Sequence, residues 1–499
     1  MEPGDGKDGQ DQIGDRIVTS FAKTATSAAA MLWLAACSVG DDYVRPEAAK
    51  PAGWANSVAA APQTPEWPTA EWWKRFNSRR LDALMAAAQS ANFDIAAAAA
   101  RVRQADAQLQ TAGAALLPSL SGTAGGSRSR SAWGESVKSS SSSLSSSGAS
   151  ISNSFNLGLS ASYEIDFWGK NRSTQEAAAA AAVQSRFDAR TTQLTVMSSV
   201  ATTYFDMVGQ GERLLVAKET VANAERVLAA INDRLEAGTA TALDLAQQES
   251  VVAAQRATIA PLEQTIRQDA NALAILTGRA PQEFSVEPEV LADIGLPVIR
   301  PGLPSELLAR RPDVNSAEQQ LIAANANITV ARAQLFPDIT LTGSGGFQSI
   351  ALASLTQYTS LVSSLAASIT QVIFDNGKLE GQVDYNLAKY EELVNAYRKA
   401  VISAFSDVEN ALIAVQKTTE LEDAQRANVA TARKAYEIAE AQLSGGTVDI
   451  TTVLNTQKAL FSAQDSLAQA RLLHLQAVVG LYKAMGGGWG ETPVSQPGE

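Results

Sequence analysis

The stretch Leu235-Glu-Ala-Gly238-Thr239-Ala-Thr-Ala-Leu-Asp244-Leu245 occurs twice in this chain of 499 residues. Its second copy, roughly 208 residues later, reads Leu443-Ser-Gly-Gly446-Thr447-Val-Asp-Ile-Thr-Thr452-Val453. In each copy a glycine and a threonine separate two long stretches that contain few helix breakers. Because glycine suits the left-handed conformation that ends many helices, each copy predicts a turn between two helices.

The repeat extends far beyond this turn. The same shift pairs Gly169-Lys170 with Gly377-Lys378, Val200 with Val408 and Gly278 with Gly486. Further upstream, a shift of roughly 219 residues aligns a second set of positions: Asp94 with Asp313, Leu116 with Leu335, Pro118 with Pro337 and Thr123 with Thr342. A repeat of this length indicates one structural unit built twice, so any functional site on it should also occur twice.

The composition argues against several classes of function. The net charge is −12, which disfavours a nucleic-acid partner because phosphate binding requires clustered Lys and Arg. One Cys and one His do not supply a zinc or iron site, and one Cys excludes an internal disulfide framework. The single His474 aligns with Ile266 in the repeat, which predicts a packing role. With no catalytic motif in the sequence, we expect no catalytic residues, no metal, no cofactor and no enzymatic activity.

The N-terminus has the features of a targeting segment. The apolar run Ala25–Ala36 follows Arg16 and Lys23 and is too short to span a bilayer as a helix. The sequence Leu34-Ala35-Ala36-Cys37 resembles a bacterial lipobox, in which cleavage before the cysteine precedes attachment of lipid to its sulfur. We therefore predict a signal peptide over 1–36 and an N-terminal lipoprotein segment over 37–80.

The remaining chain is expected to be mainly helical. We predict a first structural repeat over 81–277, a linker over 278–303, a second repeat over 304–486 and a flexible tail over 487–499. Both repeats contain long stretches with few breakers, and Pro261 should kink the helix in which it lies. The predicted helices are Leu81–Leu117, Lys170–Glu236, Leu243–Thr277, Pro304–Phe336, Lys378–Leu443 and Thr451–Met485.

Each repeat also contains a pair of strands. Apolar and polar residues alternate from Phe155 to Phe167, which is the period of a strand with one apolar face. We expect strands at about 119–127, 155–167, 338–347 and 363–374, of about the 9–11 residues that cross a membrane. Four membrane strands cannot close a barrel, so several chains would have to share one. The alternative is a small soluble sheet beside a helical bundle.

Together these features resemble a known family. The repeat, the turn sequence and the segment Gly40-Asp-Asp-Tyr43-Val-Arg-Pro46 look like the TolC-like outer-membrane efflux factors, in their NodT-type lipoprotein branch. Asp41 stands where the family opening has a proline. The resemblance implies a homotrimer whose long helical hairpins form an α-barrel tunnel in the periplasm. Four strands per chain would contribute to a shared 12-stranded β-barrel in the outer membrane of a Gram-negative bacterium.

The resemblance also implies partners and a function. The tunnel would dock on a periplasmic adaptor (membrane fusion) protein and an inner-membrane pump of the resistance-nodulation-division type, while outer-membrane lipid surrounds the barrel. The chain would then be the efflux duct of a tripartite export system. Two alternatives stay open, namely an exit duct for type I protein secretion and a helical scaffold lipoprotein that transports nothing. The cargo and the particular pump do not follow from the sequence.

The resemblance places two functional regions at the turns. Adaptor-docking tips correspond to Gly238, Thr239, Gly446 and Thr447. The family narrows its tunnel nearby, often with rings of carboxylates, and the matching positions are Asp244, Gln247, Thr452 and Asn455. Among these four only Asp244 carries a charge, so we expect one acidic ring and no second one, with Asp449 nearby but in a different register. The alternative is that Asp244 is a helix-terminal carboxylate favoured by the helix dipole.

We predict that the mature chain begins at a lipid-modified Cys37. Replacing Cys37 with Ala should abolish metabolic labelling by a radioactive fatty acid, because the sulfur is the attachment point. One acyl chain alone binds membranes only marginally, so the variant should still reach the membrane fraction if the strands anchor it. Labelling that persists in the Cys37→Ala protein would contradict the prediction.

Overall fold

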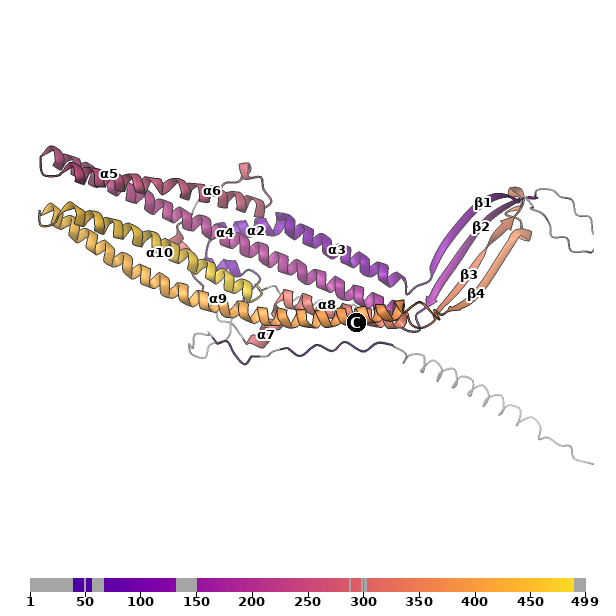
Figure 1. The fold of residues 1–499 in the computed structure, drawn as a ribbon. Coiled ribbons are helices and arrows are strands. Elements are labelled where there is room, and N and C mark those ends of the chain that lie inside the picture. Colours follow the sequence, from indigo (N-terminus) through magenta and orange to yellow (C-terminus); the bar gives the residue numbers. More distant parts are fainter. Residues whose placement is uncertain are drawn as a thin grey trace, which may run out of the picture. The chain divides into compact units, whose positions relative to one another are not determined.

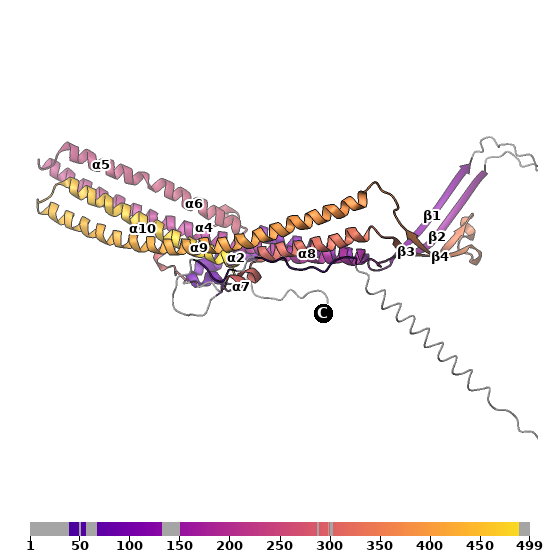
Figure 2. The same ribbon diagram turned by 60° about the horizontal axis from the view of Figure 1, so that its bottom comes forward.

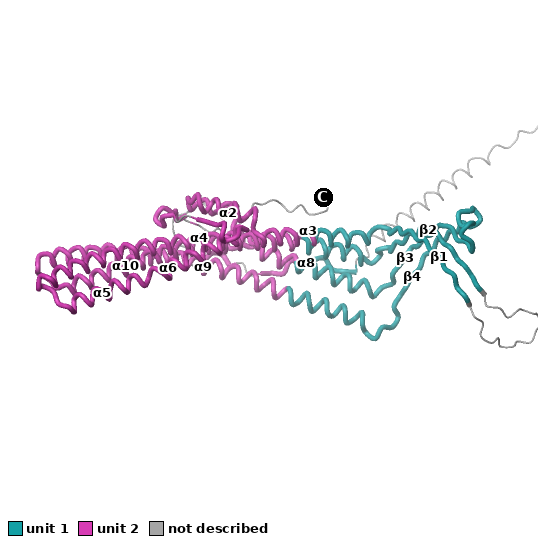
Figure 3. Tube along the Cα trace, turned by 90° about the horizontal axis from the view of Figure 1, so that it is seen from above, with its two compact units in different colours: residues 1–44, 105–182, 320–393 teal, residues 45–104, 183–319, 394–499 magenta. Residues whose placement is uncertain are grey.

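The computed structural model describes residues 39–48, 51–55, 67–131, 150–286, 289–297, 299 and 303–488. Cys37 and the predicted signal peptide lie outside these ranges. The chain divides into two compact units, shown in Figure 3. The first comprises residues 1–44, 105–182 and 320–393 and contains the strands. The second comprises residues 45–104, 183–319 and 394–499 and contains the helical turns of the repeat.

The first unit contains one antiparallel sheet of four strands in the order β1-β2-β3-β4 (Figure 1). The strands are β1 (Ser119–Ser131), β2 (Ser150–Ile165), β3 (Asp338–Ser349) and β4 (Leu361–Thr370). Leu157 lies opposite both Ala124 on β1 and Phe347 on β3, so each repeat supplies one hairpin and β2–β3 pairing joins the two repeats. Within the described residues, β1 and β4 each keep one unpaired edge.

The two faces of the sheet differ in chemistry. One face carries apolar side chains that are largely exposed in the single chain, with Leu365 at 86% of its full accessibility. Its members in register include Leu120, Leu157, Leu159, Leu341, Phe347, Leu365 and Ile369. The opposite face is rich in serine, and Ser121–Ser160 and Ser344–Ser364 pair across strands with Oγ–Oγ distances of 2.8 Å. The alternation predicted for β2 therefore extends over all four strands.

A carboxylate caps each long helix where it leaves the sheet. Asp166 accepts from the backbone N–H groups of Asn171 and Arg172, at the start of α4 (Lys170–Glu236). Asp375 does the same for Lys378 and Leu379, at the start of α9 (Lys378–Ser444). In the repeat, Asp166 aligns with Phe374, and Asp375 aligns with Phe167. The order of Asp and Phe is therefore exchanged between the two copies, but each copy keeps its capping carboxylate.

Two helices of 67 residues each are the longest elements: α4 (Lys170–Glu236) and α9 (Lys378–Ser444). Gly209 and Gly211 do not interrupt α4. In Figures 1 and 2, α5 (Ala242–Ala257) lies alongside α4, and α10 (Ile450–Ala484) lies alongside α9. Among the described residues, none of the helices is both long and apolar enough to cross a membrane.

Three predicted helices are each broken in two. The pairs are α2 (Arg79–Ala91) with α3 (Phe93–Ala114), α5 with α6 (Ile259–Leu276), and α7 (Pro304–Arg310) with α8 (Pro312–Ala333). The first break lies at Asn92, whose side chain accepts from the N–H groups of Asp94 and Ile95 and so caps α3. The expected kink at Pro261 is instead a break at Thr258. A proline inside a helix removes a backbone hydrogen bond, whereas in the first turn it removes none.

An aromatic core stabilises the second unit. The short 3₁₀ helix η1 (Trp72–Phe76) buries Trp72 against Tyr482 of α10, with ring centroids 5.0 Å apart. Phe76 packs on Phe205 of α4 at 4.9 Å. The end of the predicted lipoprotein segment 37–80 is therefore part of the core. Four further 3₁₀ turns complete the described fold: η2 (Pro281–Glu283), η3 (Leu291–Asp293), η4 (Leu352–Ser354) and η5 (Tyr358–Ser360).

Gly278 and Gly486 should tolerate substitution far less than the turn glycines do. Gly278 follows α6 with φ +68°, and an added Cβ would lie 2.2 Å from the carbonyl oxygen of Ala91, at the end of α2. Gly486 follows α10 with φ +89° and meets the carbonyl oxygen of Arg310 at 2.7 Å. Strain at positive φ and the clash together should cost about 2–4 kcal/mol. Gly238→Ala is the matched control, because nothing lies within 4 Å of its added Cβ.

Thermal unfolding of the purified protein checks this contrast. Gly278→Ala and Gly486→Ala should each lower the melting temperature clearly more than Gly238→Ala. Equal shifts for all three variants would show that the conformation of the glycine, and not the neighbouring helix end, sets the cost.

Candidate functional site

The turns between α4 and α5 and between α9 and α10 are the repeated tips on which the sequence analysis placed the functional residues. Gly238 has φ +72° and Gly446 has φ +69°, the left-handed conformation expected for both. The N–H of Thr239 donates to the Arg234 carbonyl at 2.8 Å, and the N–H of Thr447 donates to the Gln442 carbonyl at 3.0 Å. Each tip is therefore closed by the same hydrogen-bonded helix end.

The helices that follow the tips begin with the same pair of residues in opposite order. Thr241 and Asp244 form a capping box on α5, in which the Asp244 N–H donates to Thr241 Oγ1 at 3.2 Å and the Thr241 N–H donates to Asp244 Oδ2 at 2.8 Å. On α10 the carboxylate comes first, and Asp449 Oδ1 accepts from the Thr452 N–H at 2.9 Å. Thr452 thus takes the place of Asp244, and Asp449 that of Thr241.

Both carboxylates are held in their ionised form. The Thr241 hydrogen bonds keep the pKa of Asp244 below its ordinary value, against an opposing effect from the charge of Asp449. The Thr452 hydrogen bonds lower the pKa of Asp449 in the same way. A direct hydrogen bond shows that the two tips of one chain are close together. The guanidinium of Arg234 joins them, since its Nη2 donates to the Leu443 carbonyl at 3.2 Å.

The structure places a second carboxylate at the tips, in a register of the repeat that differs from that of Asp244. Thr452 carries no charge, but the carboxylate missing from its position is supplied three residues earlier by Asp449. The physical reason is that a helix N-terminus needs one acceptor for its free N–H groups, and either residue of the pair can provide it.

The remaining predicted gate positions lie on the exposed surface of the single chain. Gln247 and Asn455 are exposed, whereas Gln248 and Gln457 are fully buried. The Gln248 amide donates to the Ala224 carbonyl of α4 at 2.7 Å. This hydrogen bond fixes the rotation of α5 about its own axis relative to α4. Gln247 and Asn455 are therefore free to face a tunnel, a neighbouring chain or a partner protein.

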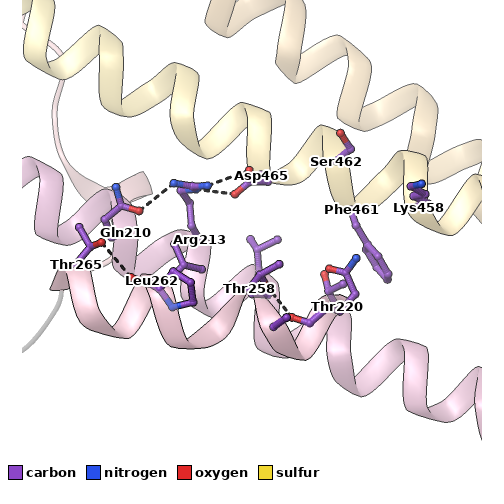
Figure 4. Close-up of a pocket in the computed structure, with 15 residues that line it drawn as sticks. Gln210, Arg213, Thr220, Thr258, Leu262, Thr265, Lys458, Phe461, Ser462 and Asp465 are labelled. Atoms are coloured by element: carbon purple, nitrogen blue, oxygen red, sulfur yellow. Dashed lines mark hydrogen bonds and ion pairs between the residues drawn. The ribbon is translucent and has the colours of Figure 1, made fainter. Parts of the chain in front are cut away.

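An open cavity of about 690 Å³ lies at the α5–α6 break, between α4, the break and α10. Figure 4 shows Arg213 of α4 reaching Asp465 of α10, with a 2.6 Å distance from Nε to Oδ1. Gln210 accepts from the same guanidinium at 3.0 Å. Lys458 and Phe461 line the cavity further along α10. This ion pair joins the first repeat to the second where the broken helix leaves space.

The single histidine, for which a packing role was predicted, is largely buried and also takes part in a polar network. His474 Nδ1 lies 2.8 Å from the carboxylate of Glu422 on α9, and Nε2 lies 3.1 Å from Thr419 Oγ1. Glu422 is buried and also accepts from Arg426 and Arg471, which compensates its charge. Arg471 additionally donates to three carbonyls around η3, so the network attaches the linker to α10. No cluster of metal-binding side chains occurs among the described residues.

Comparison with known proteins identifies similar chains over nearly the whole length. The sequence profile of the outer membrane efflux protein family matches residues 84–279 and 303–487. The chain is 42% identical over 443 residues to the pyoverdine export outer membrane protein OpmQ of Pseudomonas putida, covering 88% of this chain and 92% of that protein. It is 34% identical over 462 residues to the toluene efflux pump outer membrane protein TtgC of Pseudomonas putida, covering 92% and 94%.

Solved structures show the same fold. The outer-membrane channel OprN is similar with a TM-score of 0.82 and 26% identity, over 91% of this chain and all of that one. The open state of the outer membrane channel MtrE of Neisseria gonorrhoeae is similar with a TM-score of 0.79 and 28% identity, over 91% and 98%.

Exchanging the capping residues should leave the first tip intact. In Thr241→Asp/Asp244→Thr the first tip acquires the order of the second, so the backbone amide of residue 244 should keep its protection from hydrogen exchange. Thr241→Ala removes the acceptor of the residue 244 amide and should expose that amide, since losing a capping side chain costs about 1 kcal/mol. Equal protection in both variants would show that neither order of the pair caps the helix.

The protection of the Thr241 amide, which donates to Asp244, should also depend on pH in a fixed direction. The pKa of Asp244 is lowered by folding, so its contribution is complete above the ordinary aspartate value of about 4 and is lost as the pH falls through the lower folded value. Thr241→Asp/Asp244→Thr should show the same direction, as Asp449 does in the second tip.

Proposed function

The chain belongs to the outer membrane efflux protein family, and from this premise we propose that three copies form the outer-membrane duct of a tripartite export system. The duct passes small solutes, delivered by an inner-membrane pump, through the periplasm and across the outer membrane. Conduction of this kind is passive and requires no catalytic group. The sheet carries the proposal, because its apolar face and its two unpaired edges require lipid on one side and further strands at both ends.

The dimensions of the apolar face fit an outer membrane. From Phe155 to Ile165 the apolar positions of β2 extend over ten residue steps, or about 33 Å at the rise of a strand. Tilted by about 40°, such a strand crosses roughly 25 Å, the height of the apolar band of outer-membrane barrels. The serine-rich face then lines a wet channel, and neighbouring chains satisfy the edges of β1 and β4.

The tips are proposed as the docking site for a periplasmic adaptor protein. Each tip is exposed in the single chain and presents backbone groups around a glycine that leaves space beside it. Leu243 at the start of α5 is 65% exposed, so the first tip also offers an apolar contact. Its counterpart in the repeat is a threonine, so the two tips would contact the adaptor differently.

Relatives favour small solutes as cargo. Proteins similar to this chain are named for pyoverdine export and for toluene efflux. We propose a cargo of this kind, namely solutes small enough to leave through a 12-stranded barrel. The pump upstream, of the resistance-nodulation-division type, would select among them.

Asp244 and Asp449 are proposed to make the narrow periplasmic end cation-selective. Three chains would bring six of these carboxylates around the axis, and like charges at a confined mouth attract cations and repel anions. Because both repeats contribute, the charge at the mouth is twice what the sequence alone led us to expect.

Single-channel recording of the purified protein in planar bilayers tests the duct and its charged mouth together. The wild-type trimer should conduct with cation selectivity and be partly blocked by a divalent cation added on the periplasmic side. Asp244→Asn and Asp449→Asn should each reduce selectivity and block, and the double variant should remove most of both. Asparagine retains an acceptor for the helix N-terminus, so the caps are kept.

The control is Leu159→Pro, which removes a hydrogen bond in the middle of β2 and should prevent insertion of the trimer. Absence of channels from the wild-type trimer would overturn the proposed duct. Channels whose selectivity is unchanged in the double variant would retain the duct but exclude the two carboxylates from its mouth.

A further inference from the structure

The charges of the sheet are separated along its length. Within β1–β4 the acidic residues are Glu164 and Asp338, and the basic residues are Arg128 and Arg130. Both carboxylates lie at the end that continues into the helices, where Lys170 binds them at 2.5 and 2.9 Å. The two arginines lie near the opposite end, and within the described chain neither has a carboxylate partner. The β3–β4 connection at that end, residues 350–360, contains no charged residue.

The register places both arginines on the apolar face. Arg128 lies opposite Asn153 and Arg130 opposite Ile151, and the odd-numbered positions of β2 are those of Leu157 and Leu159. On β1 the same face carries Leu120 and then small residues at 122, 124 and 126. The arginines therefore continue the row of side chains that faces lipid, and they do not face the serine-lined interior.

Their height along the strand is also defined. Phe155, the last aromatic residue of the apolar band on β2, pairs with Gly126. Arg128 is two residues further, a distance of about 7 Å along the strand, and Arg130 is about 7 Å beyond it. Both therefore lie just outside the hydrocarbon, at the level where lipid headgroups begin. Ile151 at the level of Arg130 adds one apolar contact for the upper part of an acyl chain or sugar.

Arginine at this position matches one kind of partner. Its planar guanidinium binds phosphate oxygens through paired hydrogen bonds, and among the described residues no carboxylate pairs with these two arginines. Because the helices lie in the periplasm in the proposed duct, the arginine end faces the outer leaflet. We propose that Arg128 and Arg130 form a docking surface for the phosphate groups of the phosphorylated glycolipid in that leaflet, one such surface on each protomer.

This inference rests on the proposed membrane orientation but not on the transport activity. Binding would fix the depth and tilt of the barrel in the leaflet, since each arginine near an anionic membrane surface contributes roughly fivefold in affinity. The two arginines together should give roughly a 30-fold preference for a phosphorylated over a dephosphorylated lipid.

The test uses the full-length trimer, purified in detergent and stripped of lipid, with native mass spectrometry as the readout. The probes are bisphosphorylated lipid A, its dephosphorylated form and inorganic phosphate. Wild-type protein should bind the bisphosphorylated lipid roughly 30-fold more tightly than the dephosphorylated one. Arg128→Gln/Arg130→Gln should lose this preference, while Arg128→Lys/Arg130→Lys should keep most of it because the charge remains.

A matched control moves the charges to the other face at the same height. Adding Ser127→Arg/Ser129→Arg to the Arg128→Gln/Arg130→Gln protein restores the net charge but directs it to the interior, so the preference should stay lost. Recovery in this variant would overturn the proposal, as would an unchanged preference in Arg128→Gln/Arg130→Gln. Displacement of the lipid by millimolar inorganic phosphate would identify a site for free anions and would also overturn it.

Conductance of each variant separates this inference from the proposed function. Variants that form conducting trimers but retain the lipid preference refute the docking surface alone. A wild-type protein that forms no conducting trimer refutes the duct, whatever its lipid binding.

Discussion

Every backbone N–H and C=O group that enters lipid must find a partner within protein, and this requirement determines the design of the chain. A four-stranded sheet leaves unpaired groups along β1 and β4, and in lipid each would cost several kcal/mol. Closing the sheet with neighbouring chains removes the cost, so we expect insertion and assembly to be coupled. The two long helices, α4 and α9, belong to the same arrangement. After each β-hairpin the chain leaves the membrane through one of them, and after the first it must return to form the second β-hairpin.

The duplicated unit conserves local physical roles more strictly than residue positions. At the sheet, Asp166 and Asp375 cap α4 and α9 from adjacent positions of the repeat. At the tips, Asp244 and Asp449 cap α5 and α10 from positions three residues apart. A helix N-terminus requires an acceptor near its free N–H groups but does not fix which residue of the turn provides it. Charge at a functional surface can therefore be retained while the residue that carries it moves.

Sequence patterns determined most of the fold because they reflect local rules. The alternation in β2 and the scarcity of breakers in α4 and α9 placed those elements closely, and the turn glycines have the predicted positive φ. What the sequence did not reveal depends on contacts between distant segments. Trp72 packs on Tyr482, 410 positions away, and His474 binds a carboxylate on a neighbouring helix. Asp449 lies in a different register from Asp244, and only the structure shows that both residues cap the helix that follows their tip.

Stability is distributed unevenly in the helical unit, and this bears on its function. Large buried side chains concentrate around Trp72, Tyr204 and Tyr482, whereas α5 buries only Gln248 and Val252 among its residues. On α10 the amide of Gln457 is fully buried and has no hydrogen-bond partner among the described residues, which costs about 1–3 kcal/mol. A region with few apolar contacts and an unsatisfied polar group opens more readily than the core. The start of α5, next to the first tip, therefore belongs to the part of the helical unit that opens at the lowest cost, whereas the start of α10 buries Val453 and Leu454.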